Sequence, residues 1–185
     1  MRRRILAAAL MGLWTAGAGA AAGGEPSKTA VAAYEPMAPF APLAGSAWRG
    51  EGAGPDGAPI VDTVVYDFIL EGRALQSTHR LADGSYGGRT IIFYDEGAKE
   101  YVFHYFTTAG FHTTGTVRLE EDGFEAVETV HGHETIAQVR ARATIGEDAL
   151  TVDSLYVDRN GVEKPGRTMT YRRLDARPKL FADGE

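Results

Sequence analysis

The amino-acid sequence predicts an all-β protein that folds as a single up-and-down antiparallel β-barrel of about ten strands. Between residues 46 and 173, short segments rich in β-branched and aromatic residues alternate with turns that contain Gly, Asp or Asn, at intervals of about eight to twelve residues. The same region shows no convincing apolar period of about 3.6 residues, so helices are expected only near the termini. A closed meander encloses its own interior, which makes a binding function plausible.

Each predicted strand ends where a turn sequence begins, because the glycines of these turns supply the positive φ angles that tight hairpins require. The first strand, residues 46–52, precedes a flexible loop that contains Gly54-Pro55-Asp56-Gly57. The other predicted strands are residues 61–70, 73–81, 86–94, 100–107, 111–120, 124–130, 133–145, 150–157 and 168–173. The turns between them contain, in order, Glu71-Gly72, Asp83-Gly84, Glu96-Gly97, Ala109-Gly110, Asp122-Gly123, His131-Gly132, Gly146-Glu147 and Asn160-Gly161.

Residues 1–22 have the features of an export signal peptide. Arg2, Arg3 and Arg4 precede an apolar stretch of about ten residues and then several small residues suited to cleavage. This stretch is too short for a stable membrane span, which needs roughly twenty apolar residues. An ordinary secretory signal and a twin-arginine signal both fit these residues. The mature protein is therefore expected in the periplasm or the medium, without a stable membrane span.

Composition divides the rest of the chain into three parts. Residues 23–44 are rich in Ala, Gly, Pro and Ser and are interpreted as a flexible linker whose last apolar residues plug or flank the barrel. Residues 45–174 contain the predicted strands, and residues 175–185 form a C-terminal tail.

The cysteine content excludes disulfides, and the net charge argues against some classes of partner. The chain contains no cysteine, so its stability depends on the barrel core rather than on disulfides. Its formal net charge is -6, and this acidity argues against nucleic acid and anionic lipid as partners.

Two short motifs resemble those of calycin-type barrels. The segment Leu43-Ala44-Gly45-Ser46-Ala47-Trp48-Arg49-Gly50-Glu51-Gly52 resembles the lipocalin opening Gly-x-Trp, and more closely the Gly-x-Trp-x-Gly-x-Gly of nitrobindin-like and related uncharacterised bacterial barrels, although Ala47 lengthens the first spacing. The segment Leu70-Glu71-Gly72-Arg73-Ala74-Leu75 is similar to a corner that follows in those uncharacterised families. The resemblance implies a lipocalin-like barrel. A nitrobindin-like protein would also hold heme through a histidine near the final strand, but residues 154–185 contain no histidine, so no cofactor is expected.

A structural role is predicted for Trp48. A tryptophan at the start of the first strand can close one end of a barrel and be covered by a guanidinium from the last strand, because arginine stacks well on indole. Arg172 and Arg173 are both placed in sequence to make this contact.

The histidines do not predict a metal site. His131 and His133 would share one face of a regular strand, but Gly132 between them favours a turn that separates the two rings. A third ligand, from His104 or His112, would have to come from a neighbouring strand. No metal is therefore expected.

His79 and His104 are instead candidates for the barrel interior, because each lies inside a predicted strand and shares a face of that strand with apolar neighbours. If their faces line the lumen, they project among Val64, Tyr66, Phe68, Leu75, Ile91 and Phe93. The alternative places Tyr101, Phe103, Tyr105, Gln76 and Arg80 inside, and the strand at 100–107 is apolar on both faces. We take the histidine face as the lumen. The predicted ligand-binding residues are then Tyr66, Phe68, His79, Phe93, His104, Phe106, Tyr156 and Tyr171.

The function predicted from these features is the binding of a small apolar or weakly acidic molecule in the lumen of an exported barrel. The sequence contains no recognisable hydrolase or dinucleotide motif, so binding is favoured over catalysis. The alternative is a barrel enzyme of the isomerase or lyase type that uses a luminal His or Tyr as acid and base. A third possibility is a filled barrel that acts through its surface, with the aromatic segment at 101–106 as the contact.

Overall fold

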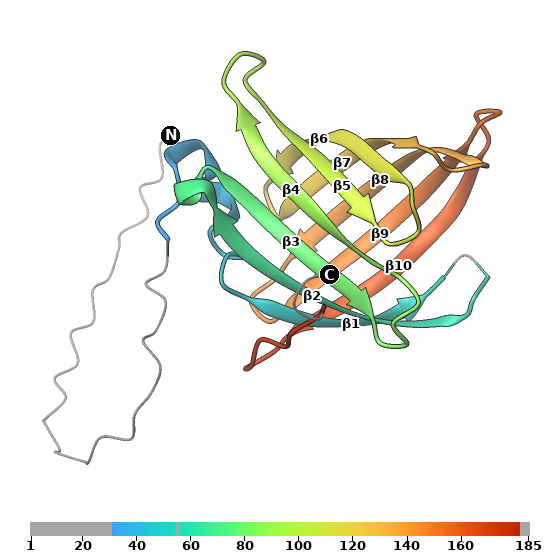
Figure 1. Ribbon diagram of the computed structural model, residues 1–185, viewed down its shortest axis with the longest axis horizontal. Coiled ribbons are helices and arrows are strands. Elements are labelled where there is room, and N and C mark those ends of the chain that lie inside the picture. The colour runs from blue at the N-terminus through green and yellow to red at the C-terminus, as the bar shows by residue number, and fades with distance from the viewer. Residues whose placement is uncertain (1–30, 55, 182–185) are drawn as a thin grey trace, which may run out of the picture.

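The computed structural model describes residues 31–54 and 56–181 and shows a closed antiparallel barrel of ten strands (Figure 1). The all-β, up-and-down fold predicted from the sequence is confirmed. The expected export signal, residues 1–22, lies outside the described residues. The strands are β1 (Ala47–Ala53), β2 (Pro59–Ile69), β3 (Ala74–Leu81), β4 (Gly87–Asp95), β5 (Glu100–Thr107), β6 (His112–Glu120), β7 (Gly123–His131), β8 (Ile136–Ile145), β9 (Ala149–Asp158) and β10 (Glu163–Arg173).

Every strand pairs with its neighbours in sequence, and β1 pairs with β10 to close the barrel. Helical structure among the described residues is limited to two short 3-10 segments, η1 (Glu35–Phe40) and η2 (Leu70–Gly72). No described helix has the length and apolar character needed to cross a membrane. The last strand begins five residues earlier than predicted, because a bulge between Pro165 and Thr168 lets β10 continue past a proline and a glycine.

Strand register decides which side chains face the lumen. Buried Leu75 on β3 lies opposite buried Ile92 on β4, and Ile92 lies opposite buried Phe103 on β5. Side chains alternate along a strand, so His79, four residues after Leu75, faces inward, whereas His104, next to Phe103, faces outward. The two histidines therefore lie on opposite sides of the barrel wall.

One end of the barrel is closed by the segment around η1. Met37, Phe40 and Leu43 are fully buried, and the Phe40 ring meets Tyr101 edge to face at a centroid distance of 5.1 Å. The Tyr101 hydroxyl donates a hydrogen bond to the Pro36 carbonyl, 2.7 Å away. This apolar part of the region expected to be a linker is thus packed into the barrel, and we call residues 35–43 the plug. Figure 1 shows η1 against one end of the barrel, beside the β2–β3 connection.

Trp48 joins the plug to the strands. Its side chain is completely buried, and its indole N–H donates a hydrogen bond of 2.6 Å to the Ser46 hydroxyl. The Arg173 guanidinium lies 4.5 Å from the centre of the Trp48 ring and donates a hydrogen bond to the Pro42 carbonyl. Arg172 lies on the exposed outer face, so the guanidinium that covers Trp48 comes from Arg173.

Candidate functional site

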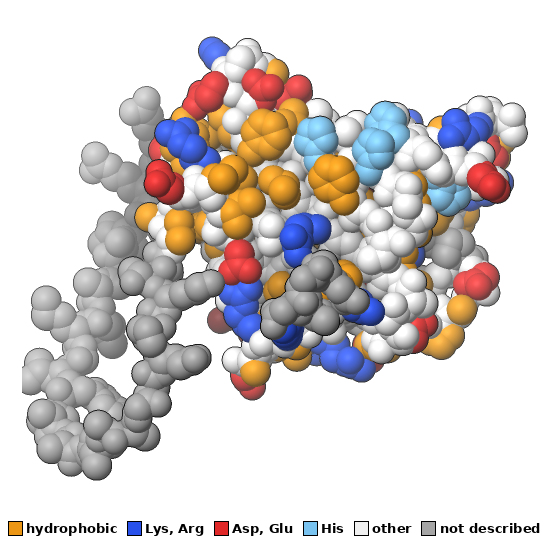
Figure 2. Space-filling view, viewed as in Figure 1, with side chains coloured by type: hydrophobic (Ala, Val, Ile, Leu, Met, Phe, Trp, Pro, Cys, Tyr) orange, Lys and Arg blue, Asp and Glu red, His pale blue; other side chains and the backbone are white. Residues whose placement is uncertain are grey.

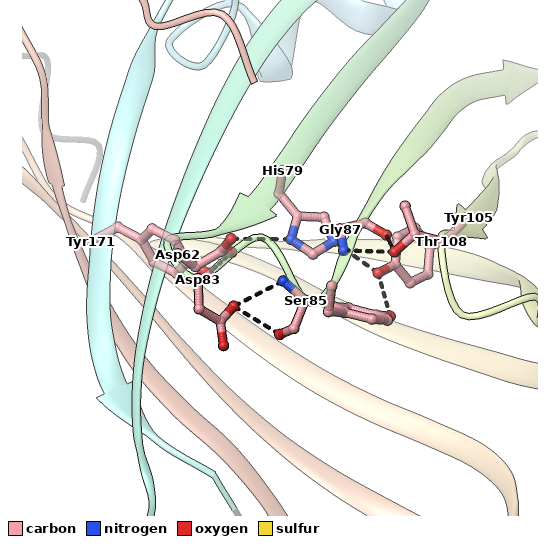
Figure 3. Close-up of polar contacts among 9 residues, drawn as sticks. Asp62, His79, Asp83, Ser85, Gly87, Tyr105, Thr108 and Tyr171 are labelled. Atoms are coloured by element: carbon pink, nitrogen blue, oxygen red, sulfur yellow. Dashed lines mark hydrogen bonds and ion pairs between the residues drawn. The ribbon is translucent and has the colours of Figure 1, made fainter. Parts of the chain in front are cut away.

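A chain of hydrogen-bonded polar side chains crosses the lumen at the end opposite the plug. We call this end the mouth; it is formed by the β1–β2 connection and by the connections at residues 82–86, 108–111, 132–135 and 159–162. His79 is central: its Nδ1 lies 3.2 Å from Asp62 Oδ1, and its Nε2 lies 2.8 Å from the Tyr105 hydroxyl. Figure 3 shows Asp62, His79 and Tyr105, from β2, β3 and β5, in a continuous row.

The row extends at both ends through tyrosine hydroxyls. Tyr171 on β10 donates to Asp62 Oδ2 at 2.9 Å, and the Tyr105 and Tyr86 hydroxyls are 2.6 Å apart. Both His79 ring nitrogens and both Asp62 oxygens therefore have partners. The Asp62 and His79 side chains are only 7% and 15% exposed, so water competes little for these bonds.

Two strand glycines make room for the tyrosines of this network. A Cβ atom on Gly88 would lie 2.4 Å from the Tyr105 ring, and one on Gly50 would lie 2.4 Å from the Tyr171 ring. Each ring therefore lies flat against the backbone of a neighbouring strand, an approach that only glycine permits.

Arg167 adds a positive charge to the same end of the lumen. Its guanidinium lies 5.3 Å from the centre of the Tyr86 ring. Its backbone N–H donates to the Ser154 hydroxyl at 2.7 Å, within the β10 bulge that redirects the side chains here. Among the described residues, no carboxyl group forms an ion pair with Arg167. Arg167 was not among the predicted site residues, although Pro165-Gly166 just before it is a usable signal of a bulge.

Aromatic rings line the rim of the mouth. Tyr86 stacks on Phe111 at a centroid distance of 6.3 Å, and Phe111 meets His133 edge to face at 5.2 Å. Tyr86 and Phe111 were not among the predicted site residues, because each lies at the boundary between a turn and a strand, where alternation does not indicate a face.

Burial keeps the luminal tyrosines protonated. It raises the pKa of Tyr66, Tyr86, Tyr105 and Tyr171, and for the last three the Arg167 charge opposes this rise only in part. At neutral pH these hydroxyls therefore act as hydrogen-bond donors and acceptors rather than as bases.

Glu128 places a carboxyl group in the lumen, where it accepts a hydrogen bond from the Thr113 hydroxyl. Burial raises its pKa above the ordinary value of 4.5, and the Thr113 bond opposes that shift. A carboxyl group whose pKa is higher in the folded than in the unfolded protein stabilises the fold fully when the pH lies below its unfolded-state pKa. This stabilisation is lost as the pH rises through the folded-state pKa.

Glu128→Gln should therefore raise stability at pH 7 but leave it almost unchanged near pH 4, since the amide stays neutral at both. Chemical denaturation of both proteins between pH 4 and pH 8 measures the difference. Glu125→Gln, on the outer face of the same strand, is the control and should act in the opposite direction, because the hydrogen bond from Arg118 lowers the pKa of Glu125. A Glu128→Gln difference that does not change with pH would contradict this account.

The structure brings together some of the predicted ligand-binding residues and separates others. Pairing places five of the eight on the luminal side: Tyr66, Phe68, His79, Tyr156 and Tyr171. Phe93, His104 and Phe106 lie on the outer face, so the prediction that they line the lumen is wrong. Ile91, which was expected beside them, faces outward as well. The reason is that β4 and β5 carry apolar residues on both faces, and alternation alone does not distinguish inside from outside.

These outward residues contribute to a groove on the barrel surface. A shallow hollow of about 570 Å³ is lined by Phe93, Val102 and His104 with residues of β6 and β7. Phe106, which is 53% exposed, stacks between His104 and His112 beside it. Figure 2 shows hydrophobic side chains and histidines gathered on this side of the molecule, over β4 and β5.

The remaining histidines make separate contacts at the mouth. Gly132 has a φ of +81°, His131 contacts Thr114 and stacks on His112, and His133 accepts hydrogen bonds from the backbone of the next turn. Among residues 31–54 and 56–181, no three His, Cys, Asp or Glu side chains are grouped to hold a metal ion. After its bulge, β10 turns Arg167, Met169 and Tyr171 inward, and buried Met169 packs on Gly52.

Comparison with known proteins identifies a fold but not a family. No protein-family model and no curated protein matches the chain. Among solved structures, the chain is similar to the crystal structure of Rv2717c from M. tuberculosis, with a TM-score of 0.60 and 16% sequence identity. The match covers 77% of this chain and 99% of Rv2717c. The chain thus shares its overall fold with a protein of very different sequence.

Proposed function

We propose that this protein is an exported binding protein that takes a small, mostly apolar molecule into its lumen through the mouth. The observation that carries the proposal is the hydrogen-bonded row from Tyr171 through Asp62, His79 and Tyr105 to Tyr86, set among aromatic walls. Ligand sites typically combine apolar walls with a few fixed polar groups that orient the ligand.

The arrangement of the network favours binding over acid–base catalysis. A general base needs a free lone pair within reach of the substrate, but both His79 nitrogens already have protein partners. Tyr105 and Tyr86, whose pKa values are raised by burial, are too weakly acidic to exchange protons near neutral pH. Rigid hydroxyls that are already hydrogen-bonded suit recognition better than proton transfer.

The sequence supports the other parts of the proposal. The resemblance of residues 43–52 and 70–75 to calycin-type barrels, with the nitrobindin-like pattern as the nearest, agrees with a binding role for the interior. Residues 1–22 support export to the periplasm or the medium.

Protein purified from its native compartment should carry a small molecule that native mass spectrometry detects. Ser77, an inward residue of β3 opposite Tyr66, offers a position to block the lumen. Ser77→Trp should strongly reduce the amount of molecule recovered, whereas Thr170→Trp, on the exposed outer face of β10, should leave it unchanged. Circular dichroism establishes that both variants are folded.

Tyr105→Phe tests the same site without adding bulk. Loss of this hydroxyl should weaken binding of the recovered molecule about 2- to 10-fold by calorimetry, the usual effect of one neutral hydrogen bond. Equal recovery from Ser77→Trp and wild type, with unchanged affinity in Tyr105→Phe, would exclude the lumen as the binding site. His104→Ala should not alter binding, since His104 lies outside.

A further inference from the structure

The charges around the mouth limit which molecules the lumen accepts. Arg167 holds its guanidinium over Tyr86, and none of the described carboxyl groups forms an ion pair with it. Asp62 is already bonded to His79 and Tyr171, and Glu128 accepts its bond from Thr113. The two luminal acids therefore have partners of their own, whereas the five N–H donors of Arg167 form no ion pair with any acid in residues 31–54 and 56–181.

The backbone of Arg167 is held in place, and its guanidinium lies over the Tyr86 ring. Ser154 fixes the Arg167 backbone from both sides, because its hydroxyl accepts from the Arg167 N–H and donates to the Arg167 carbonyl at 3.0 Å. A Cβ on Gly166 would lie 2.4 Å from that hydroxyl, so the contact depends on glycine. Arg167 is largely covered, and its charge acts on Tyr86, Tyr105 and Tyr171 together. A partly buried guanidinium with a fixed backbone favours a bidentate acid.

The rest of the lumen sets the size and the charge of that acid. The half next to the plug is filled by a continuous apolar cluster that includes Phe40, Leu75 and Phe103, so a long chain has no space there. A dianion would bring a second negative charge toward Asp62 and Glu128. Lys164 at this end is already paired with Asp158, so among the described residues Arg167 is the arginine or lysine of the lumen that is left to balance it.

We propose that the lumen binds a small monocarboxylate, whose carboxylate is held by the Arg167 guanidinium at the mouth and whose apolar body extends inward toward Tyr105. This inference rests on the proposed binding function and specifies its ligand class. The carboxylate receives two parallel N–H bonds from Arg167, and the body contacts the aromatic wall.

Two probes that differ only in their polar group test whether the lumen prefers a carboxylate. 2-Naphthoate and 2-naphthalenemethanol have the same ring system, so calorimetry with the full mature chain isolates the carboxylate. Wild type should bind 2-naphthoate at least about 10-fold more tightly than the alcohol, the usual gain from hydrogen bonds to a charged group. Palmitate and the dianionic 2-naphthyl phosphate should both bind more weakly than 2-naphthoate.

Substitutions of Arg167 test whether its guanidinium binds the carboxylate. Arg167→Gln should lower the affinity for 2-naphthoate about 10- to 100-fold and should change the affinity for the alcohol little. The affinity of Arg167→Lys for 2-naphthoate should lie between those of wild type and Arg167→Gln, because lysine keeps the charge but cannot form two parallel hydrogen bonds to the carboxylate. Arg172→Gln, which removes the same charge from the outer face of the same strand, should match wild type. Thermal denaturation establishes that all three are folded.

The outcomes separate the two proposals. If acid and alcohol bind equally and Arg167→Gln has no selective effect, the carboxylate inference is wrong and the binding lumen stands. If 2-naphthyl phosphate binds most tightly, the ligand is a dianion and the monocarboxylate inference is again wrong. If no probe binds and the native protein carries no molecule, both proposals are wrong.

Discussion

Trp48→Ala is expected to lower the free energy of unfolding by about 3–5 kcal/mol, the range for truncating a fully buried aromatic side chain. Three contacts are lost together: core packing at 0% exposure, the indole hydrogen bond to Ser46, and the guanidinium of Arg173 stacked on the ring. Urea denaturation followed by far-UV circular dichroism measures the effect, since a chain that begins at residue 23 has no other tryptophan to report on.

Smaller changes around Trp48 serve as controls. Ser46→Ala removes the hydrogen-bond acceptor and should have an effect of about 1 kcal/mol, whereas Arg173→Ala removes the stacked cation and should have an effect of about 1–2 kcal/mol. A denaturation midpoint unchanged by Trp48→Ala would show that this end of the barrel contributes nothing to stability, and it would weaken the calycin resemblance of residues 43–52.

Phe40→Ala should lower the free energy of unfolding by a similar amount, about 3–5 kcal/mol. Phe40 is 2% exposed and packs on Tyr101 and Phe124, so truncation leaves a cavity between the plug and the strands. The same denaturation experiment measures this loss. Phe106→Ala is the matched control: it makes the identical chemical change on the outer face, at 53% exposure, and should change stability by less than about 1 kcal/mol.

The result for Phe40 decides whether the segment before β1 belongs to the folding unit. Equal effects of Phe40→Ala and Phe106→Ala would mean that residues 35–43 lie against the barrel without stabilising it. A large difference would mean that the smallest stable fragment begins before η1 rather than at residue 45.

Local chemistry in the sequence determines the number and the order of the strands. Turn glycines such as Gly84, Gly110 and Gly161 have φ angles between +73° and +85°, which other residues rarely adopt, so each marks a hairpin wherever the chain goes next. Because the connections between strands are short, successive strands are antiparallel neighbours, and the meander follows. The stacking of an arginine from the last strand on Trp48 was also predictable, since the first and last strands of a closed meander must pair.

Which face of each strand lines the lumen was decided only by the tertiary structure. Alternation shows that His104 and Phe103 point in opposite directions, but with apolar residues on both faces of β5 it does not show which of them points inward. The register from Leu75 through Ile92 to Phe103 settles this, because opposite residues in adjacent strands face the same side of the sheet. His79 is inside and His104 outside for that reason.

The polar network and Arg167 depend still more on closure of the barrel. Asp62 and Tyr171 are 109 residues apart, and they meet only because β1, which separates β2 from β10, carries a glycine where the Tyr171 ring crosses it. Arg167 faces the mouth because a bulge shifts the alternation of β10 by an amount that the residue pattern does not specify. The sequence by itself determined the strands and their order, because turns are local. The tertiary structure determined the lining of the lumen, because that lining depends on pairing registers between distant segments and on where the strand alternation is interrupted.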